Sequence, residues 1–340
     1  MGDYLLGVDV GGTKTHALLA DGAGQVLGFG SSGPGNYEVV GWDGLRRALA
    51  GAVGGALDAA GLSRDDVAAA GFGVAGYDWP GERAPTQAAI DALGLAAPYG
   101  LVNDAVIALL AGAEAGWGVA LVAGTSNNCR GRDRQGREGR VTGCGPALGE
   151  YGGGTEVVAR AVQDVARAWT RRGPATALTP VLVGRAGARD AADLLEGLVL
   201  GRYHLSAADA PAVLETAAAG DPVAQEIARW AGRELASLAG GVIRQLGFET
   251  LAFDLVLAGS LYDGSPLLVE ALQAGVWAVA PGARPVRLSG PPVVGGVLLA
   301  AEKAGLDRPP LRRRLLAAGD LYPGTAPPLR KSGDQQSSTC

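Results

Sequence analysis

The sequence is poor in the residues that build disulfide scaffolds and histidine-rich metal sites. Its 340 residues include three cysteines, Cys129, Cys144 and Cys340, without a CxxC pair, and two histidines, His16 and His204. An odd and sparse set of cysteines argues against a disulfide framework and fits a reducing compartment. Two histidines are too few for a histidine-rich metal cage.

The sequence also lacks long apolar runs and an excess of positive charge. Glycine or charged residues interrupt every apolar stretch well before about 20 residues, the length of a membrane-spanning helix. The chain enters a predicted strand at Asp3 with no basic segment or cleavage site, so we expect no signal peptide. The net charge of −5 and the pI of about 5.2 argue against a nucleic-acid partner, because a phosphate backbone needs a basic face. The basic stretches 130–140 and 312–314 are typical of solvated loops and tails. We therefore expect a cytoplasmic protein that binds neither membranes nor nucleic acid.

What the sequence does contain is the composition of an ordinary globular protein. Apolar residues make up 48 % and charged residues 19 %, which excludes a wholly disordered chain. At roughly 150 residues per domain, the length predicts about two domains. The 56 glycines show no collagen period and gather at the ends of apolar runs, where turns and phosphate-binding loops occur.

The order of the apolar runs predicts two mixed α/β lobes that open in the same way. Three strands joined by short turns precede a helix at 41–60, and strands and helices then alternate up to residue 115. The pattern restarts with strands at 118–123, 128–132 and 140–142, the last two around a polar turn at 133–139. This predicts a duplicated topology, with one lobe at 1–116 and a second at 117–304.

The second lobe is predicted to carry a helical insertion. Patterns rich in Ala and Leu occur at 190–198, 206–219 and 223–246, and these helices offer a face for a homodimer. Beyond Gly305, prolines and a polar end predict an extended or disordered tail over 305–340.

The strongest motif is Gly7-Val8-Asp9-Val10-Gly11-Gly12-Thr13-Lys14-Thr15. A buried strand delivers Asp9 to a hairpin tip, and two glycines follow, so backbone N–H groups can approach an anion without a Cβ in the way. Thr13 adds a hydroxyl and Lys14 a charge. An acid beside a phosphate cradle makes sense when Mg²⁺ lies between them, and Asp9 can act through water. A plain glycine hairpin is the alternative; a Walker A loop is excluded because Thr13 follows Gly12 and a strand comes next.

Two G-x-G-x-x-G matches, at 28–33 and 71–76, are poor dinucleotide fingerprints because neither opens a helix. The second match runs directly into Tyr77-Asp78-Trp79-Pro80.

A second phosphate-type turn, Ala123-Gly124-Thr125-Ser126-Asn127-Asn128, again ends an apolar strand. Alone such a turn is unspecific, but two of them can hold one polyphosphate from both sides. Between them lies Leu101-Val102-Asn103-Asp104, an acid at the end of a strand and the start of a helix. Asp104 is either a helix N-cap or a general base, because phosphoryl transfer to an alcohol needs a carboxylate near the hydroxyl.

These motifs, together with segments 256–260 and 292–296, come in the order of the sugar kinase/Hsp70/actin superfamily. Within it the chain resembles the BadF/BadG/BcrA/BcrD ATPase family, and most of all its N-acetylglucosamine kinase branch. Residues 124–130 are similar to that branch's G-T-G-S-N-C-R run, and residues 143–150 to its G-W-G-x-x-x-G-D run. The resemblance covers about residues 4–304. It implies an actin-like ATPase fold, with two ribonuclease H-like lobes around a nucleotide cleft.

The resemblance also implies an ATP- and Mg²⁺-dependent kinase that phosphorylates an amino sugar such as N-acetylglucosamine or glucosamine. Asp104 would be the general base, and Asp9 would organise the Mg²⁺. ATP would be bound by Gly11, Gly12, Thr13, Lys14, Gly124, Thr125, Gly259 and Ser260. The sugar would be bound by Asn36, Asn103, Asp104, Asn127, Asn128, Gly145 and Glu150.

Two departures from the family pattern leave the identity of the sugar open. Cys144 stands where the pattern has Trp, and Glu150-Tyr151-Gly152 where it has Asp-Glu-Gly. A regulatory ATPase without a sugar substrate is the alternative reading. An iron–sulfur activase fits poorly, because Cys129 and Cys144 lie fifteen positions apart. A non-catalytic sugar sensor would be expected to lose Asp9 or Asp104, and both are present.

Overall fold

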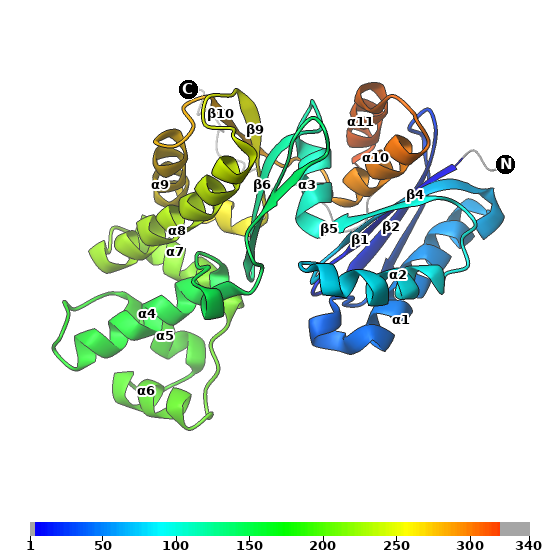
Figure 1. Ribbon diagram of the computed structural model, residues 1–340. Helices are drawn as coiled ribbons and strands as arrows, with labels where there is room; N and C mark the ends of the chain where they lie inside the picture. Colours follow the sequence, from blue (N-terminus) through cyan, green and yellow to red (C-terminus); the bar gives the residue numbers. More distant parts are fainter. Residues whose placement is uncertain (1–3, 320–340) are drawn as a thin grey trace, which may run out of the picture.

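The N-terminal lobe is built on a five-stranded sheet with strand order β3-β2-β1-β4-β5. In the computed structural model, which describes residues 4–319, strands β1 (Tyr4–Val10), β2 (Thr15–Asp21) and β3 (Val26–Ser32) form an antiparallel meander (Figure 1). Strands β4 (Val67–Val74) and β5 (Tyr99–Asn103) extend the sheet in parallel to β1. The sheet is buried on both faces at β1 and β4, as their continuous apolar runs predict.

Helices cover both faces of this sheet. Helix α1 (Tyr37–Ala60) packs on β2 and β3, with α2 (Arg83–Asp91) beside it. The opposite face carries α3 (Asp104–Gly112) and α10 (Val293–Lys303). Helix α1 begins earlier than the predicted residue 41 and is interrupted there, because Gly41 has a φ of 68°.

The C-terminal lobe repeats the same strand order. Its sheet, β10-β9-β6-β7-β8, contains β6 (Gly118–Ala123), β7 (Asn127–Arg132), β8 (Glu138–Arg140), β9 (Phe253–Ala258) and β10 (Ala283–Arg287). Strand β6 takes the place of β1: it pairs antiparallel with β7 and parallel with β9. The predicted duplication of topology is therefore confirmed. The third strand lies at 138–140 instead of 140–142, because the backbone beyond Arg140 turns away to bond with a carboxylate described below.

The helical insertion of the C-terminal lobe extends away from its sheet (Figure 1). It comprises α4 (Gly154–Trp169), α5 (Leu178–Ala186), α6 (Ala191–Val199) and α7 (Ala210–Ala218), followed by α8 (Pro222–Leu246) and α9 (Pro266–Trp277) against the sheet. Helix α5 was not predicted. Short 3-10 helices occur at Arg64–Asp66, Pro80–Glu82, Gly145–Leu148, Ala207–Asp209 and Ser260–Asp263. Within residues 4–319, no helix is both long and apolar enough to cross a membrane.

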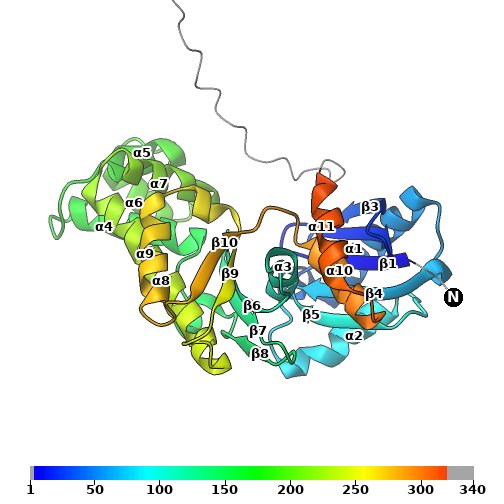
Figure 2. The same ribbon diagram turned by 90° about the horizontal axis from the view of Figure 1, so that it is seen from above.

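The chain returns to the N-terminal lobe at its C-terminal end, which differs from the predicted boundaries. Helix α10 falls in the predicted second lobe but packs on β1, β4 and α3, and α11 (Arg308–Ala317) packs on α10 (Figure 2). Buried Leu311 and Leu315 join α11 to the core around α10. The prediction of an extended or disordered segment is thus wrong for α11, whereas 320–340 lie outside the described residues.

Glycines allow α10 to lie directly on the sheet. A Cβ on Gly295 would lie 1.8 Å from the carbonyl oxygen of Ile107 in α3, and one on Gly7 would lie 2.3 Å from the amide nitrogen of Val297. These separations leave no room for a side chain, so the backbone of α10 lies directly against that of α3 at Gly295 and against that of β1 at Gly7.

Three arginines on one face of the C-terminal sheet contact the N-terminal lobe. Arg130 and Arg132 are two residues apart on β7, and Arg140 on β8 pairs directly with Arg130, so all three share a face. Arg132 forms a two-pronged ion pair with Glu302 of α10, at 2.6 and 3.0 Å. The prediction of a solvated basic stretch over 130–140 is therefore wrong for the residues that bridge the lobes.

The most deeply buried of these bridges joins Arg130 to Asp78. Their side chains are 3 % and 8 % exposed. Burial raises the pKa of Asp78, and the guanidinium of Arg130 opposes this rise. Because a buried charge is costly without its partner, the pair ties the β4–α2 loop to β7.

We predict that Gly295→Ala lowers the unfolding free energy by about 1–3 kcal/mol or more, because its Cβ would meet the Ile107 backbone. Gly54→Ala is the matched control. It lies within α1 with open space around it, so alanine should raise stability by about 0.5–1 kcal/mol. Urea denaturation of both variants measures this. An unchanged midpoint for Gly295→Ala would contradict the packing described.

We predict that Arg130→Met destabilises the protein by about 3–5 kcal/mol at neutral pH, because it leaves Asp78 buried and unpaired. The loss should be smaller at pH 5. Removing Arg130 raises the folded-state pKa of Asp78 further above its unfolded value. At low pH the Asp78 side chain of the variant is therefore protonated and can stay buried, whereas at higher pH it becomes a buried charge without a partner. Arg46→Met, which removes an exposed ion pair with Asp43, should change stability little. An equal loss at both pH values would rule out the unpaired carboxylate as the cause.

Candidate active site

The two predicted glycine turns lie at equivalent ends of the two sheets. In the β1–β2 turn, Gly11 donates its N–H to the carbonyl of Lys14 at 2.9 Å. In the β6–β7 turn, Gly124 donates to the carbonyl of Ser126 at 2.9 Å. A Cβ on Gly12 or Gly124 would meet nothing within 4 Å, so the backbone is open for a ligand at both tips. Thr13 and Lys14 are exposed beside the first tip.

A pocket of about 540 Å³ lies beside the second turn. Gly124, Thr125 and Ser260 line it, which brings together three of the residues predicted to bind ATP. Alanine, proline and leucine side chains from the start and middle of α7 supply apolar lining. Gly259 adjoins the pocket with a φ of 102°, and a Cβ there would lie 2.1 Å from the carbonyl oxygen of Ala123. Glycine is therefore required for this close approach.

Two carboxylates, Asp9 near the end of β1 and Asp104 at the start of α3, lie on neighbouring elements of the first lobe, and the charge of Asp104 acts on Asp9. Burial raises the pKa of Asp9 to about 7, with the charge of Asp104 adding to the rise and Lys14 opposing it. Burial also raises the pKa of Asp104 to about 6, with Asp78 adding to the rise and the N–H of Ala105 opposing it. Two carboxylates held together in this way form a site that a cation would stabilise.

The residues present fit a magnesium ion that arrives with a nucleotide. Within residues 4–319, no three His, Cys, Asp or Glu side chains are grouped to hold a metal. A cation beside Asp9 would therefore take most of its ligands from water and phosphate, which is how Mg²⁺ is commonly bound. The open backbone at Gly12 leaves room for such a group.

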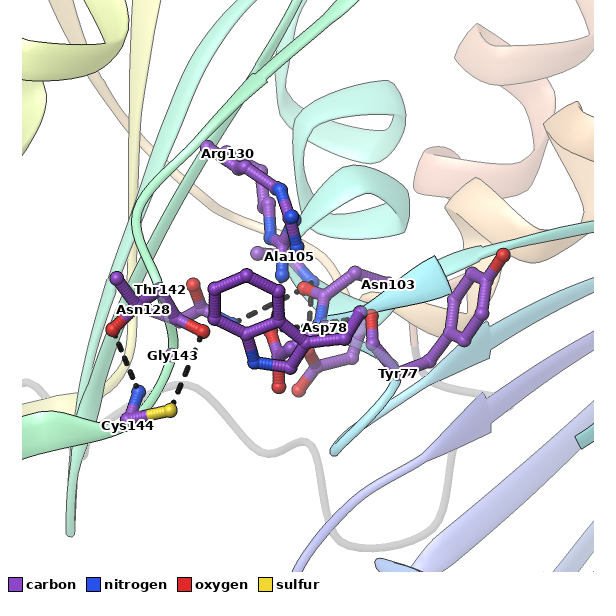
Figure 3. A network of polar contacts seen from close by, with 12 residues as sticks. Tyr77, Asp78, Asn103, Ala105, Asn128, Arg130, Thr142, Gly143 and Cys144 are labelled. Atoms are coloured by element: carbon purple, nitrogen blue, oxygen red, sulfur yellow. Dashed lines mark hydrogen bonds and ion pairs between the residues drawn. The ribbon is translucent and has the colours of Figure 1, made fainter. Parts of the chain in front are cut away.

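Asn103 organises the junction between the lobes (Figure 3). Its Oδ1 caps α3 by accepting the N–H of Ala105 at 3.0 Å, and it also accepts an N–H from the Asn128 side chain at 3.3 Å. Its Nδ2 donates to the Tyr77 carbonyl and to Asp78 Oδ1, both at 3.3 Å. The structure thus brings the predicted Asn103 and Asn128 together from different lobes, and the capping role weighed for Asp104 belongs to Asn103.

Asp78 and Arg130 belong to this network and were not predicted as site residues. Asp78 contacts both Asn103 and Arg130. In the sequence, the only indication of Asp78 is its position just after a strand that ends in glycines. Arg130 lies inside the predicted strand at 128–132. Whether a charged side chain on a strand is buried or faces solvent depends on its partner, which the sequence does not reveal.

The other predicted sugar-binding residues surround this junction. Asn36 caps α1 by accepting the N–H of Glu38 at 3.0 Å, and a Cβ on Gly76 would lie 2.5 Å from Asn36 Oδ1. Asn127 donates to Glu156 at 3.5 Å. The Oδ1 atoms of Asn127 and Asn128 are buried without a hydrogen-bond partner among the described residues, which leaves two unsatisfied acceptors at this junction.

Glu150 and Gly145 shape the loop that closes this side of the site. The carboxylate of Glu150 accepts the N–H groups of Thr142 and Gly143, at 2.5 and 2.9 Å. The carbonyl of Gly145 accepts the N–H of Glu150 at 3.0 Å. Both Glu150 carboxylate oxygens are therefore used by backbone, so the residue positions the loop. This bonding also ends β8 at Arg140.

Relatives of known activity match the chain over most of its length. The model of the BadF/BadG/BcrA/BcrD ATPase family matches residues 6–300. The N-acetyl-D-glucosamine kinase of Dictyostelium discoideum is 28 % identical over 311 residues, which are 88 % of this chain and 98 % of that protein. The N-acetylmuramic acid/N-acetylglucosamine kinase of Clostridium acetobutylicum is 28 % identical over 269 residues, which are 78 % of this chain and 88 % of that protein.

Solved structures share the fold. A putative N-acetylglucosamine kinase from Chromobacterium violaceum gives a TM-score of 0.68 at 24 % identity, covering 88 % of this chain and 99 % of that one. A ROK family glucokinase from Streptomyces griseus gives 0.52 at 22 % identity, covering 86 % and 97 %. The expected actin-like fold with two ribonuclease H-like lobes is confirmed. With its motifs, its fold and a family model that spans nearly all of its two lobes, the chain belongs to the BadF/BadG/BcrA/BcrD ATPase family.

Proposed function

We propose that the protein is an ATP-dependent kinase that phosphorylates an amino sugar such as N-acetylglucosamine or glucosamine. The observation that carries this proposal is the position of Asp104. It begins α3 at the junction of the lobes, next to Asn103 and electrostatically coupled to Asp9. The kinase relatives support the sugar class.

ATP is proposed to bind with its adenosine in the pocket beside Gly124 and its phosphates at the two glycine turns. The pocket volume of about 540 Å³ lies in the range of ligand sites of this kind. The N–H of Gly12 and the charge of Lys14 are the groups offered to phosphate oxygens. The N–H of Gly124 already bonds to the Ser126 carbonyl, and the open space at this glycine lets the phosphates approach the second turn. Asp9 would hold Mg²⁺, which neutralises charge on the transferring phosphoryl group.

Asp104 is proposed as the base that accepts the proton of the attacking sugar hydroxyl. Its pKa, raised to about 6, still lies below neutral pH, so most of the carboxylate is ionised, and the higher pKa makes it a better proton acceptor than an ordinary aspartate. The unsatisfied Oδ1 atoms of Asn127 and Asn128 would accept hydroxyl or amide donors of a sugar that reaches them. Closure of the lobes would exclude water, which otherwise competes as the acceptor.

The homodimer and the cytoplasmic location expected from the sequence stay predictions. A regulatory ATPase of the same family, without a sugar substrate, is the alternative that the assays below separate.

We predict that ADP release depends strongly on an amino sugar. A coupled assay over N-acetylglucosamine, glucosamine, N-acetylmuramic acid and glucose should show a large rate increase with at least one amino sugar. Slow ADP release that does not depend on any sugar would contradict the kinase and support the regulatory ATPase.

We predict that Asp104→Asn lowers kcat by about 10²- to 10⁴-fold, because the amide cannot accept the hydroxyl proton. Nucleotide affinity, measured by calorimetry, should change little. Asp58→Asn, an exposed position on α1, is the matched control and should retain full activity. Equal loss of catalysis and nucleotide binding in Asp104→Asn would indicate a purely structural role.

We predict that activity falls on the acid side of the pH profile. Asp104 must be deprotonated to act as base, and its pKa of about 6 is raised, so the active form is lost as pH falls through that value. A bound cation shifts this limb lower. A rate profile from pH 5 to 8 measures the limb, and a rate that rises as pH falls would contradict the assignment.

A further inference from the structure

The loop that follows β4, residues 75–82, connects the residues assigned to the sugar. Its Gly76 lies against Asn36, with a would-be Cβ 2.5 Å from Asn36 Oδ1. The next residue, Tyr77, is held through its carbonyl by Asn103. Asp78 then pairs with Arg130 of the other lobe. The loop therefore runs along the proposed acceptor side of the site within the first lobe, and Asp78 contacts the other lobe.

This loop is held in place by Glu82. The Oε2 atom of Glu82 accepts the N–H groups of Asp78 and Trp79 at 2.6 and 2.7 Å. Its Oε1 atom accepts the hydroxyl of Tyr37, which follows Asn36, at 2.8 Å. The backbone of Trp79 is thus fixed before any sugar binds, which lowers the entropic cost of using its side chain as a binding surface.

The Trp79 indole lies where the two lobes meet. The guanidinium of Arg140, on the edge strand β8, lies 4.4 Å from the centre of its ring. The residue is 41 % exposed. The neighbouring residue, Asp78, contacts the loop that follows β8 in the other lobe, because a Cβ on Gly143 would lie 2.5 Å from Asp78 Oδ1. The residue after Gly143 is Cys144, whose exposed side chain is a small thiol. The Trp79 indole is therefore a much larger apolar surface beside this contact.

The indole follows Asp78, which bonds to Asn103 and Arg130, so an apolar surface adjoins a polar network. The C–H face of a sugar ring and the methyl of an acylamino group are apolar, whereas their hydroxyl and amide groups need polar partners. The asparagines described above supply the polar partners, and Trp79 supplies an apolar one.

We propose that Trp79 is a specificity-determining residue that packs against the acylamino substituent of the acceptor sugar. This inference rests on the proposed kinase function and deepens it by assigning the substrate class as 2-acylamino sugars rather than free amino sugars. Glucosamine lacks the acyl group, so it forgoes this contact. Arg140 holds the indole from the other lobe, so this surface is built from both lobes.

The test compares N-acetylglucosamine with glucosamine in Trp79→Ala. Losing an apolar contact of this size should lower kcat/KM for N-acetylglucosamine about 10- to 100-fold, through KM. The values of kcat and of KM for ATP, and kcat/KM for glucosamine, should change less than about threefold. Trp79→Phe should restore most of the preference. Trp169→Ala, which removes a tryptophan on α4 that is 56 % exposed, is the matched control and should behave as wild type.

A fluorescence titration keeps the test decisive if Trp79→Ala does not fold. N-acetylglucosamine should change the tryptophan emission of the wild type and of Trp169→Phe, and this change should be lost in Trp79→Phe. An unaltered preference in Trp79→Ala, an equal loss for both sugars, or a full emission change in Trp79→Phe would overturn the proposal. Failure of the kinase function itself is a separate outcome, seen as sugar-independent ADP release by the wild type.

Discussion

The buried ion pair between Asp78 and Arg130 is the interaction on which the geometry of the site depends. Neither charge can stay buried alone, so the pair fixes the β4–α2 loop against β7. Asn103 binds the same carboxylate and caps α3 with its other end. This electrostatic contact therefore links the second lobe, through Asn103, to the start of the helix that begins with Asp104.

The repeated strand order gives the site its symmetry. In both sheets the central strand pairs antiparallel with the next strand and ends in a glycine turn whose tip is open. The carboxylates lie on one lobe, while the apolar pocket and the helical insertion lie on the other. The two halves share a backbone plan and differ in chemistry, which agrees with the proposal that one lobe offers the carboxylates and the other a pocket for the nucleotide.

Sequence reasoning found the elements whose signals are local. The glycine turns, the Asn103–Asp104 pair and most strands follow from apolar runs that end in characteristic residues. It missed what depends on distant partners. The burial of Arg130 needs Asp78, which lies 52 positions away. The loop after β8 bonds to the carboxylate of Glu150, and helix α11 needs a surface provided by α10. Glu150 itself was expected at the sugar, and its bonds to backbone could be seen only in three dimensions.

The return of α10 and α11 to the first lobe has a consequence for how the polypeptide matures on the ribosome. The glycine-lined face of β1 and β4 is completed by residues from 293 onward, so the half that is made first cannot finish folding first. Until the last segment emerges, that face stays without α10. The later half is covered by its own helices on one face and by α3, which is made earlier, on the other. Domains often fold in the order of their synthesis, and here the order of completion is reversed.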